Sequence, residues 1–252
     1  MNILHNKIYI DLNCDMGEAI GNDAAIMPFI SSANIACGFH AGNTETMQQT
    51  VALCLQNNVA IGAHPGFNDI ANFGRTAMQL SQKALYSLVS TQIIALHKIC
   101  IDNKTTLHHV KPHGALYNMA ATNAAMAHTI AQAIKDIDEN LILYGLAESC
   151  LITEAKAIGL KTANEVFADR TYQDDGSLTS RKEKNALIEE EEQSINQVLQ
   201  MVTKKTVVSI NSKIISCNAE TVCIHGDGKH AVAFAQKINE ALKQNNIGIQ
   251  TI

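Results

Sequence analysis

The sequence predicts an α/β fold in which parallel strands alternate with helices and carry polar side chains at one rim. Short apolar runs alternate with segments of helical periodicity along most of the chain. Six of these runs end in His, Asp, Glu, Lys or Arg, which is typical of an active site at the C-terminal ends of parallel strands. The 252 residues, 46% of them hydrophobic, suffice for one core of barrel size. We therefore expect a single barrel domain over residues 1–252.

Taken in order, the apolar runs and the periodic segments define the expected elements. Strands are expected over 7–13, 31–36, 59–63, 107–111, 141–146, 161–167 and 221–225. Helices are expected over 43–57, 81–102, 122–136, 147–158, 189–204 and 229–245. The helix over 43–57 has the clearest start, because Asn43 or Thr44 can cap it. Within 205–220 the segment VVSINSKIIS alternates without a long crossover, which predicts a β-hairpin before the last strand.

Charge and cysteine content exclude several classes of protein. The net charge of −5 and the pI near 6.0 leave no basic field to attract nucleic acid or an anionic membrane. The N-terminus lacks a signal-peptide core, and no apolar stretch suggests a membrane span, so we expect a cytoplasmic protein. Seven cysteines without a CxxC pair indicate reduced, mostly buried thiols.

Arginine is rare, and its positions are informative. The chain has only Arg75, Arg170 and Arg181, all in loop-like segments. Arginine binds carboxylate or phosphate in a bidentate way that lysine does not match, which points weakly to an anionic ligand. The alternative, that these arginines only bind backbone carbonyls, is about as well supported.

The first apolar run, IYIDLNCDMGE, carries three acidic groups. A strand period of two places Tyr9, Asp11 and Asn13 on one face, which in a barrel points to the interior. Asp15 and Glu18 follow in the next loop. Acidic groups so close together suit metal binding or general base catalysis. In the alternative interpretation, Asp15 and Glu18 only cap the next turn.

Two histidines occupy matching positions after the second and third runs. His40 in CGFHAG and His64 in GAHPG each lie between glycines, which allow a sharp turn and close approach of a ligand. A single histidine is usually structural, but two at matching strand ends favour a site. With Asp15 they form a candidate metal site of one carboxylate and two imidazoles.

The segment HHVKPHGALY concentrates further candidates. Pro112 fixes the backbone between Lys111 and His113, and a lysine at a strand end can bind phosphate or act as a base. His109 is the member most easily explained as structural. The later runs EVFADR and CIHGD supply Glu165, Asp169, Arg170, His225 and Asp227. For Asp169 and Arg170, a buried ion pair that only braces the rim is a serious alternative.

Some catalytic motifs are missing from the sequence. It contains no GxxxxGK[ST] phosphate loop, no GxGxxG after the first strand and no GxSxG elbow. The sequence therefore does not support assigning the chain to the P-loop, dinucleotide-binding or serine-hydrolase classes.

Taken together, the motifs resemble a known family. They are DLNCDMGE (11–18), SANIACGFHAG (32–42), GAHPGFND (62–69), FGR (73–75), VKPHGALYN (110–118), EVFADRTY (165–172) and CIHGD (223–227). In their order and length they resemble those of the LamB/YcsF family, from near residue 8 to the C-terminus.

The resemblance implies a distorted TIM-like (β/α) barrel of the glycoside hydrolase/deacetylase type with about seven parallel strands. It also implies ATP-dependent opening of the 5-oxoproline lactam to L-glutamate, carried out with two partner subunits, B and C. The site residues then have two roles. The catalytic set is Asp11, Asp15, His40, His64, Lys111 and His113, with Asp15, His40 and His64 as candidates for a divalent metal ion. The set that binds substrate or phosphate is Arg75, Glu165, Asp169, Arg170, His225 and Asp227.

Two departures from the family pattern matter. The chain reads DMGEAIG where the family usually has DLGEGFG, and NFGRT where it often has GFGRR. Thr76 therefore leaves Arg75 as the only guanidinium in that loop.

Two other functions stay open at this point. The fold group and the Asp/His rim also suit a metal-dependent carbohydrate deacetylase, although the absence of Trp removes the usual platform for sugar stacking. A non-catalytic scaffold protein within a complex is the second alternative, but so many ionisable groups at strand ends would be a costly way to build one.

Overall fold

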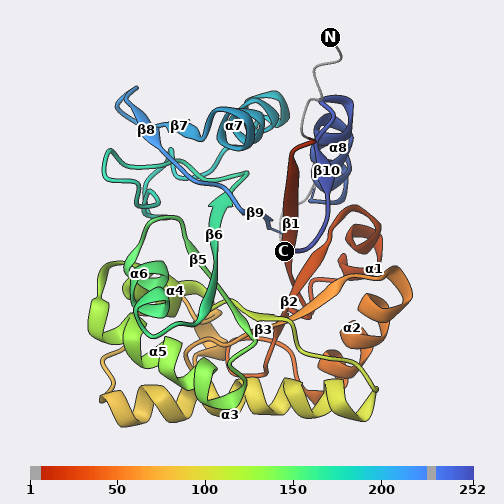
Figure 1. Ribbon diagram of the computed structural model, residues 1–252, viewed down its shortest axis with the longest axis vertical. Helices are drawn as coiled ribbons and strands as arrows, with labels where there is room; N and C mark the ends of the chain where they lie inside the picture. The colour runs from red at the N-terminus through yellow and green to blue at the C-terminus, as the bar shows by residue number, and fades with distance from the viewer. Residues whose placement is uncertain (1–6, 226–230) are drawn as a thin grey trace.

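Seven parallel strands close into a barrel in the computed structural model, which describes residues 7–225 and 231–252 (Figure 1). The strands pair in chain order, and the last pairs back with the first, which closes the barrel. They are β1 (Tyr9–Met16), β2 (Ser32–Ala36), β3 (Ala60–His64), β4 (His109–Val110), β5 (Ile142–Leu146), β6 (Lys161–Phe167) and β9 (Thr221–Ile224). The expected TIM-like barrel of about seven parallel strands is confirmed.

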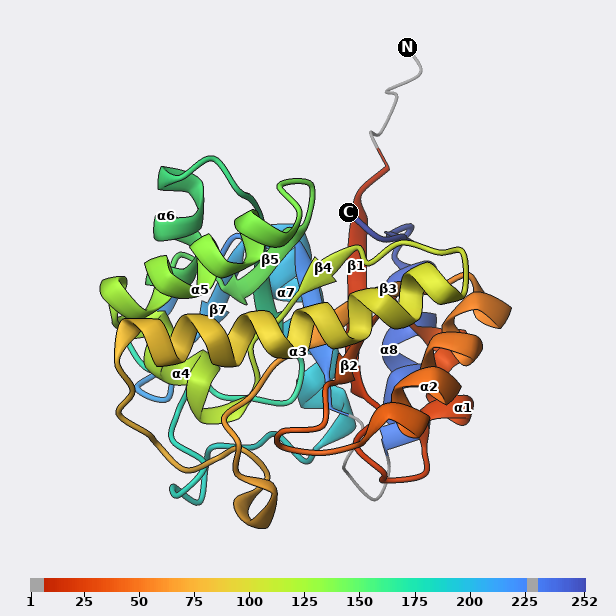
Figure 2. The same cartoon turned by 90° about the horizontal axis from the view of Figure 1, so that it is seen from below.

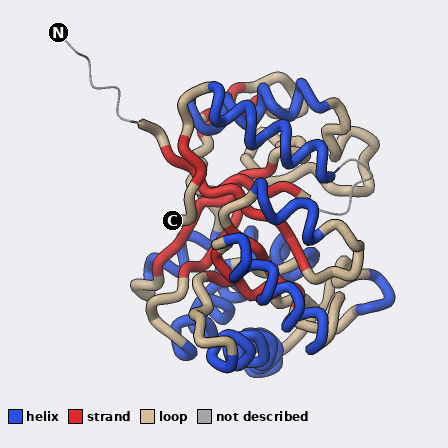
Figure 3. The backbone as a smooth tube through the Cα atoms, turned by 90° about the vertical axis from the view of Figure 1, so that its right-hand side faces the viewer, coloured by secondary structure: helices blue, strands red, loops and turns tan. Residues whose placement is uncertain are grey.

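Helices surround the strands, as the tube drawing in Figure 3 shows. They are α1 (Asp23–Ile26), α2 (Thr44–Asn57), α3 (Gln82–Asp102), α4 (Gly114–Thr122), α5 (Ala124–Ile137), α6 (Cys150–Ala157), α7 (Glu191–Lys204) and α8 (Ala231–Gln244). Two short 3-10 turns are η1 (Met27–Phe29) and η2 (Ile70–Asn72). The expected cap of α2 is present, because the Asn43 side chain accepts a hydrogen bond from the Thr46 backbone N–H at 2.9 Å.

Outside the barrel lie two small additions. The predicted hairpin is confirmed as β7 (Thr206–Val208) paired antiparallel with β8 (Ile214–Ser216). The short strand β10 (Gly248–Ile249) pairs with the start of β1 and was not expected. Neither α1 nor α4 was expected. Helix α4 begins directly after His113, which is its N-cap residue.

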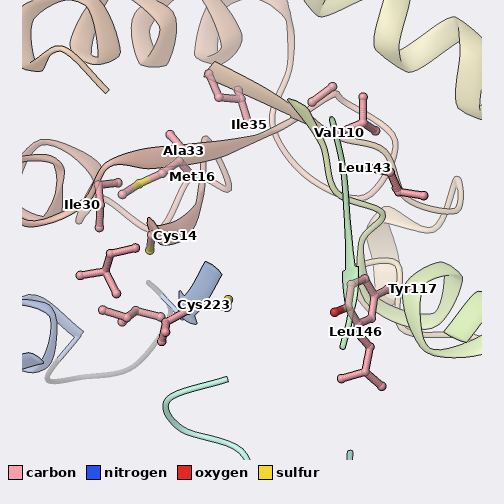
Figure 4. Packing of buried hydrophobic residues seen from close by; sticks show 14 of the residues in the cluster. Cys14, Met16, Ile30, Ala33, Ile35, Val110, Tyr117, Leu143, Leu146 and Cys223 are labelled. Atoms are coloured by element: carbon pink, nitrogen blue, oxygen red, sulfur yellow. The ribbon is translucent and has the colours of Figure 1, made fainter. Parts of the chain in front are cut away.

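Alternate side chains of β1 point to opposite sides of the strand, one toward the helices and the other into the barrel. Leu12, Cys14 and Met16 belong to the apolar core between strands and helices, part of which Figure 4 shows. The intervening Asp11, Asn13 and Asp15 point into the barrel. The prediction that the polar face of this strand lines the interior of a barrel is confirmed for Asp11 and Asn13. It is wrong for Tyr9, which is 52% exposed at the start of the strand, and Asp15 belongs to β1 and not to the following loop.

The barrel interior is polar and hydrogen bonded. Asn34 of β2 donates to Asn13 of β1 at 2.7 Å, and Asn13 donates to Thr221 of β9 at 2.7 Å. The buried His109 ring of β4 lies 2.8 Å from Asn34 and stacks on Tyr144 of β5 with ring centroids 4.1 Å apart. These contacts across the interior fix the strands that carry the site at one end.

The long helix α3 crosses the outside of the barrel (Figure 2). With 21 residues and a mean hydropathy of 1.4 over an 18-residue window, it is long and apolar enough to span a membrane by length and composition alone. This corrects the expectation that the chain has no such stretch. The core helix of a soluble protein passes the same test, and α3 buries Leu85, Val89, Ile93 and Leu96 against the barrel and α5. We therefore describe α3 as a packing helix.

Candidate active site

A cavity of about 540 Å³ opens where the barrel strands end. Seven of the residues predicted for the site line it: Asp15, His64, Arg75, Lys111, His113, Arg170 and His225. Because parallel strands end at the same rim, residues from separate segments of the chain meet here. A volume of this size is typical of sites for small ligands.

Three other predicted residues support the lining from behind. The His40 ring stacks on His113 with centroids 3.8 Å apart. Glu165 contacts Lys111, and Asp169 contacts His225, each at 2.8 Å. Asp227 lies outside the described residues.

Asp11 does not reach the cavity, which corrects its expected place in the site. Its carboxylate accepts hydrogen bonds from the hydroxyls of Ser31, Ser32 and Thr221 at 2.6 to 2.7 Å. Ser32 and Thr221 are the first residues of their strands, so Asp11 lies toward the opposite end of the barrel. Strand alternation correctly predicted the face of Asp11, but it carries no information on how far along the barrel the cavity extends.

Lys111 is the centre of a buried charge cluster. Its ammonium lies 2.8 Å from Asp15 Oδ1, 2.8 Å from Glu165 Oε1 and 3.0 Å from Cys223 Sγ. Burial alone would lower the pKa of Lys111, but the charges of Asp15 and Glu165 raise it well above its usual value. Lys111 is therefore a fixed cation at the floor of the cavity and not a base.

The pKa values of two partners of Lys111, Asp15 and Cys223, are also shifted, in opposite directions. Burial alone would raise the pKa of Asp15, yet His64 and Lys111 lower it well below its usual value. Burial raises the pKa of the Cys223 thiol well above its usual value, so this residue stays protonated. Cys223 thus packs beside the lysine and does not supply a nucleophile.

Three histidines and Glu18 form a second cluster next to the first. His113 Nδ1 lies 2.9 Å from His64 Nε2, and Glu18 Oε1 lies 3.6 Å from both His40 Nε2 and His113 Nδ1. All four side chains are buried. Burial, together with neighbouring His64, lowers the pKa of His40 to about 3 and that of His113 well below its usual value.

Glycine makes this density of rings possible. Gly74 has φ +65, and a Cβ there would lie 2.7 Å from His40 Cβ and 2.9 Å from His113 Cδ2. Any larger residue would push the two stacked rings apart.

The second cluster could hold a metal ion. One ligand atom from each of Glu18, His40, His64 and His113 lies within 4.8 Å of the others. Two of these, His40 and His64, were predicted as metal candidates. The third candidate, Asp15, lies 3.3 Å from His64 Nε2 but bonds Lys111 with its other oxygen.

A third group links Asp169, His225 and Arg181. Both carboxylate oxygens of Asp169 lie 2.8 Å from His225 Nδ1, and Arg181 lies 3.0 Å from His225 Nε2. A guanidinium can only donate, so Nε2 accepts and Nδ1 carries the proton toward Asp169. Burial alone would raise the pKa of Asp169, but His225 and Arg181 lower it.

The remaining arginines differ in their environment. Arg170 is buried and donates to the backbone carbonyls of Thr179 and Ala186, so it braces the loop that follows β6. The sequence allowed a buried Asp169–Arg170 ion pair that only braces the rim. Arg170 does brace the rim, through backbone carbonyls, but Asp169 pairs with His225 instead. Arg75 is exposed, and its guanidinium lies 4.9 Å from the centre of the Phe73 ring.

Three residues of the site were not in the predicted site set. The sequence indicated metal binding or base catalysis for the acidic group that includes Glu18, and an anionic ligand for the rare arginines that include Arg181. The place of Cys223 under Lys111 had no signal in the sequence, because the contact joins residues 112 positions apart.

The chain is similar in sequence to one protein family and to several named proteins over nearly its full length. The model of the LamB/YcsF family matches residues 10–252. A Staphylococcus epidermidis protein, named as the A subunit of 5-oxoprolinase, is 52% identical over 251 residues, which are 98% of this chain and 100% of that relative. A protein of the same name from Tolumonas auensis is also 52% identical, over 96% of this chain and 99% of its own length.

Solved structures are similar as well. The lactam utilization protein from Thermus thermophilus is 37% identical with a TM-score of 0.92, over 97% of this chain and 100% of that chain. A T48 deacetylase with substrate has a TM-score of 0.50 at 10% identity, over 96% of this chain and 87% of that chain, and so shares only the fold.

Proposed function

Because the chain belongs to the LamB/YcsF family, we propose that it is the A subunit of an ATP-dependent 5-oxoprolinase, which opens 5-oxo-L-proline to L-glutamate. The observation that carries this proposal is the full-length similarity to proteins of that name, together with the cavity in which the predicted residues meet. The partners in the proposal are the B and C subunits.

The cavity suits a small anionic substrate. Its lining includes Arg75, Arg170, Arg181 and Lys182 in addition to Lys111. 5-Oxoproline is a five-membered lactam with one carboxylate, and guanidinium groups bind carboxylate or phosphate in a bidentate way. A cavity of about 540 Å³ also leaves space for a phosphate on the amide oxygen of the lactam.

ATP enters the proposal through the chemistry of the lactam. Resonance makes the amide slow to hydrolyse, and phosphorylation of the amide oxygen would turn it into a better leaving group. The chain lacks a phosphate loop, which supports binding of the nucleotide chiefly by the partner subunits. The A subunit would then receive the activated lactam.

Lys111 would stabilise the negative charge that develops when water attacks the ring carbon. Its ammonium is already oriented by Asp15 and Glu165, so little reorganisation is needed during the reaction. The histidine cluster and Asp15 lie beside it and would position the attacking water.

His225 would act as the general base. Asp169 holds its Nδ1 proton, which leaves the Nε2 lone pair directed into the cavity lining, where Arg181 now contacts it. When Arg181 moves to an anionic substrate, Nε2 is free to take a proton from the attacking water and return it to the ring nitrogen as the C–N bond breaks. The ring-opened product is then γ-glutamyl phosphate, and attack of a second water on this acyl phosphate releases phosphate and glutamate.

The experiment that tests this function measures glutamate and phosphate released from 5-oxoproline and ATP. The purified chain is assayed alone, with one partner at a time and with both. We expect coupled release only when this chain and both partners are present. Release by B and C at the same rate without this chain would reject the proposal.

The proposal also covers the cellular location of the protein and the alternative of a deacetylase. All seven cysteines are free thiols, as expected in a reducing compartment, so we propose a cytoplasmic location. Among the comparisons, the deacetylase alternative is supported only by a fold shared at 10% identity, and we do not propose it.

A further inference from the structure

We propose that Glu18, His40, His64 and His113 bind one divalent transition-metal ion, with zinc as the ion that best suits them. The site lies within the proposed active site, but the inference rests on geometry and does not require that the substrate is 5-oxoproline. It adds Glu18 and His113 to the expected ligands and removes Asp15.

Backbone contacts fix which ring nitrogens face the cluster. His64 Nδ1 lies 2.7 Å from the carbonyl oxygen of Lys111, and His113 Nε2 lies 2.9 Å from that of Phe73. A carbonyl only accepts, so each of these nitrogens carries the proton. The other nitrogens, His64 Nε2 and His113 Nδ1, therefore present lone pairs to the cluster. Metal-binding histidines are commonly held in this way, with the outer N–H donated to a carbonyl.

These two lone pairs face each other at 2.9 Å. Two neutral acceptors at that distance repel, so a cation or a proton has to lie at this point. A proton on His64 Nε2 would satisfy that pair and Asp15 Oδ2, which lies 3.3 Å from the same nitrogen. It would leave His40, which is 1% exposed and has no hydrogen-bond partner for either ring nitrogen among the described residues.

A metal ion accounts for all four side chains together. With metal–ligand distances of about 2.0 to 2.2 Å, neighbouring ligands of a tetrahedral ion lie roughly 3.3 Å apart. Three of the six separations, at 2.9, 3.6 and 3.6 Å, lie on both sides of that value, and none exceeds 4.8 Å. Small rotations of the rings would bring the four ligand atoms around one ion.

A second group of possible ligands is already filled. Asp15, Cys223 and His225 also lie close together, but the Lys111 ammonium contacts Asp15 at 2.8 Å and Cys223 at 3.0 Å. The lysine supplies the positive charge that a metal would bring there. Asp15 is thus committed to Lys111, and the metal belongs to the neighbouring cluster.

The ligand types select the class of ion. Three imidazoles and one carboxylate suit zinc, cobalt, nickel or iron, whereas magnesium and calcium prefer sites built from oxygen. We therefore expect zinc to bind much more tightly than magnesium.

The first test measures metal content. The full chain is stripped with a chelator, incubated with zinc sulfate and analysed for metal after gel filtration. We expect one zinc per chain and a higher melting temperature. The Glu18→Gln and His113→Asn variants should bind zinc at least about tenfold more weakly. The matched controls His225→Asn, from the second group, and His128→Asn, from the surface, should keep one zinc.

Cobalt provides a readout that does not depend on the variants folding. Cobalt added to the stripped wild-type chain should give the visible absorption bands of a four-coordinate ion, and zinc should remove them. Stoichiometry below one tenth with no cobalt spectrum would overturn the inference, as would loss of zinc only in His225→Asn. Absence of glutamate release from a zinc-loaded complex would instead contradict the proposed function and leave the metal site standing.

Discussion

The Lys111 ammonium lies 2.8 Å from the Asp15 carboxylate, and both groups are buried beneath the cavity. Removing two charges from water costs more than their attraction usually returns, so such a pair is a poor way to stabilise a fold. Glu165 adds a second carboxylate at the same distance. A fixed cation held between two carboxylates is better explained by the chemistry of the site.

Replacement of Asp15 tests whether that orientation matters. In Asp15→Asn, Lys111 loses one of two carboxylates, and we expect kcat of the assembled complex to fall by about 100-fold. Leaving part of a buried pair uncompensated should also lower the melting temperature. Asp136→Asn, an exposed carboxylate on α5, is the matched control and should change neither value. An unchanged kcat in Asp15→Asn would reject this role.

His225 and Asp169 should act as a unit. We expect His225→Asn to lower kcat by about 100-fold or more and to flatten the pH dependence of the rate, because the general base is lost. Asp169→Asn should have a similar effect, since it removes the group that orients the ring. The surface variant His128→Asn is the control. Full activity of both site variants would exclude a base at His225.

Asp11 should affect stability and not turnover. Asp11→Asn disturbs hydrogen bonds from three hydroxyls, and we expect the free energy of unfolding to fall by about 1–3 kcal/mol. The kcat of the folded complex should stay within about twofold of the wild type, because the carboxylate lies away from the cavity. Chemical denaturation and steady-state rates check both parts. A large loss of kcat without loss of stability would return Asp11 to the catalytic set.

The Asp169–His225 pair predicts a pH dependence of stability. Because the folded-state pKa of Asp169 is lower than its usual value of 3.8, its ionised form stabilises the fold above that pH. This contribution is lost as the pH falls through the folded-state pKa. The difference in unfolding free energy between wild type and Asp169→Asn should therefore be constant near neutrality and shrink below about pH 4. A difference that grows on acidification would contradict the assigned contact.

Much of the barrel could be predicted, because each strand is a short apolar run with its own local signal. The two-residue period of β1 even indicated the polar interior face. The short helix α4 was missed because Gly114–Thr122 overlaps the motif read for chemistry. Strand β10 was missed because two residues carry no measurable period.

Less of the site could be predicted, because its contacts join distant segments. His40, His64 and Lys111 were found as polar residues after strands, but their partners depend on how the loops fold back. The sequence could not separate Asp15 beside Lys111 from Glu18 beside the histidines, since both belong to the same short motif. Arg181 lies in the long loop after β6, where no periodicity predicts its contact with His225.

The most direct test of the central claim compares complexes built with the wild-type chain and with its Lys111→Met variant. Glutamate and phosphate release from 5-oxoproline and ATP is measured per assembled complex, with Lys156→Met on the surface of α6 as control. We expect the wild-type and Lys156→Met complexes to release both products in equal amounts. The Lys111→Met complex should assemble but release glutamate at least about 100-fold more slowly. Glutamate release at the wild-type rate from an intact Lys111→Met complex would contradict the account.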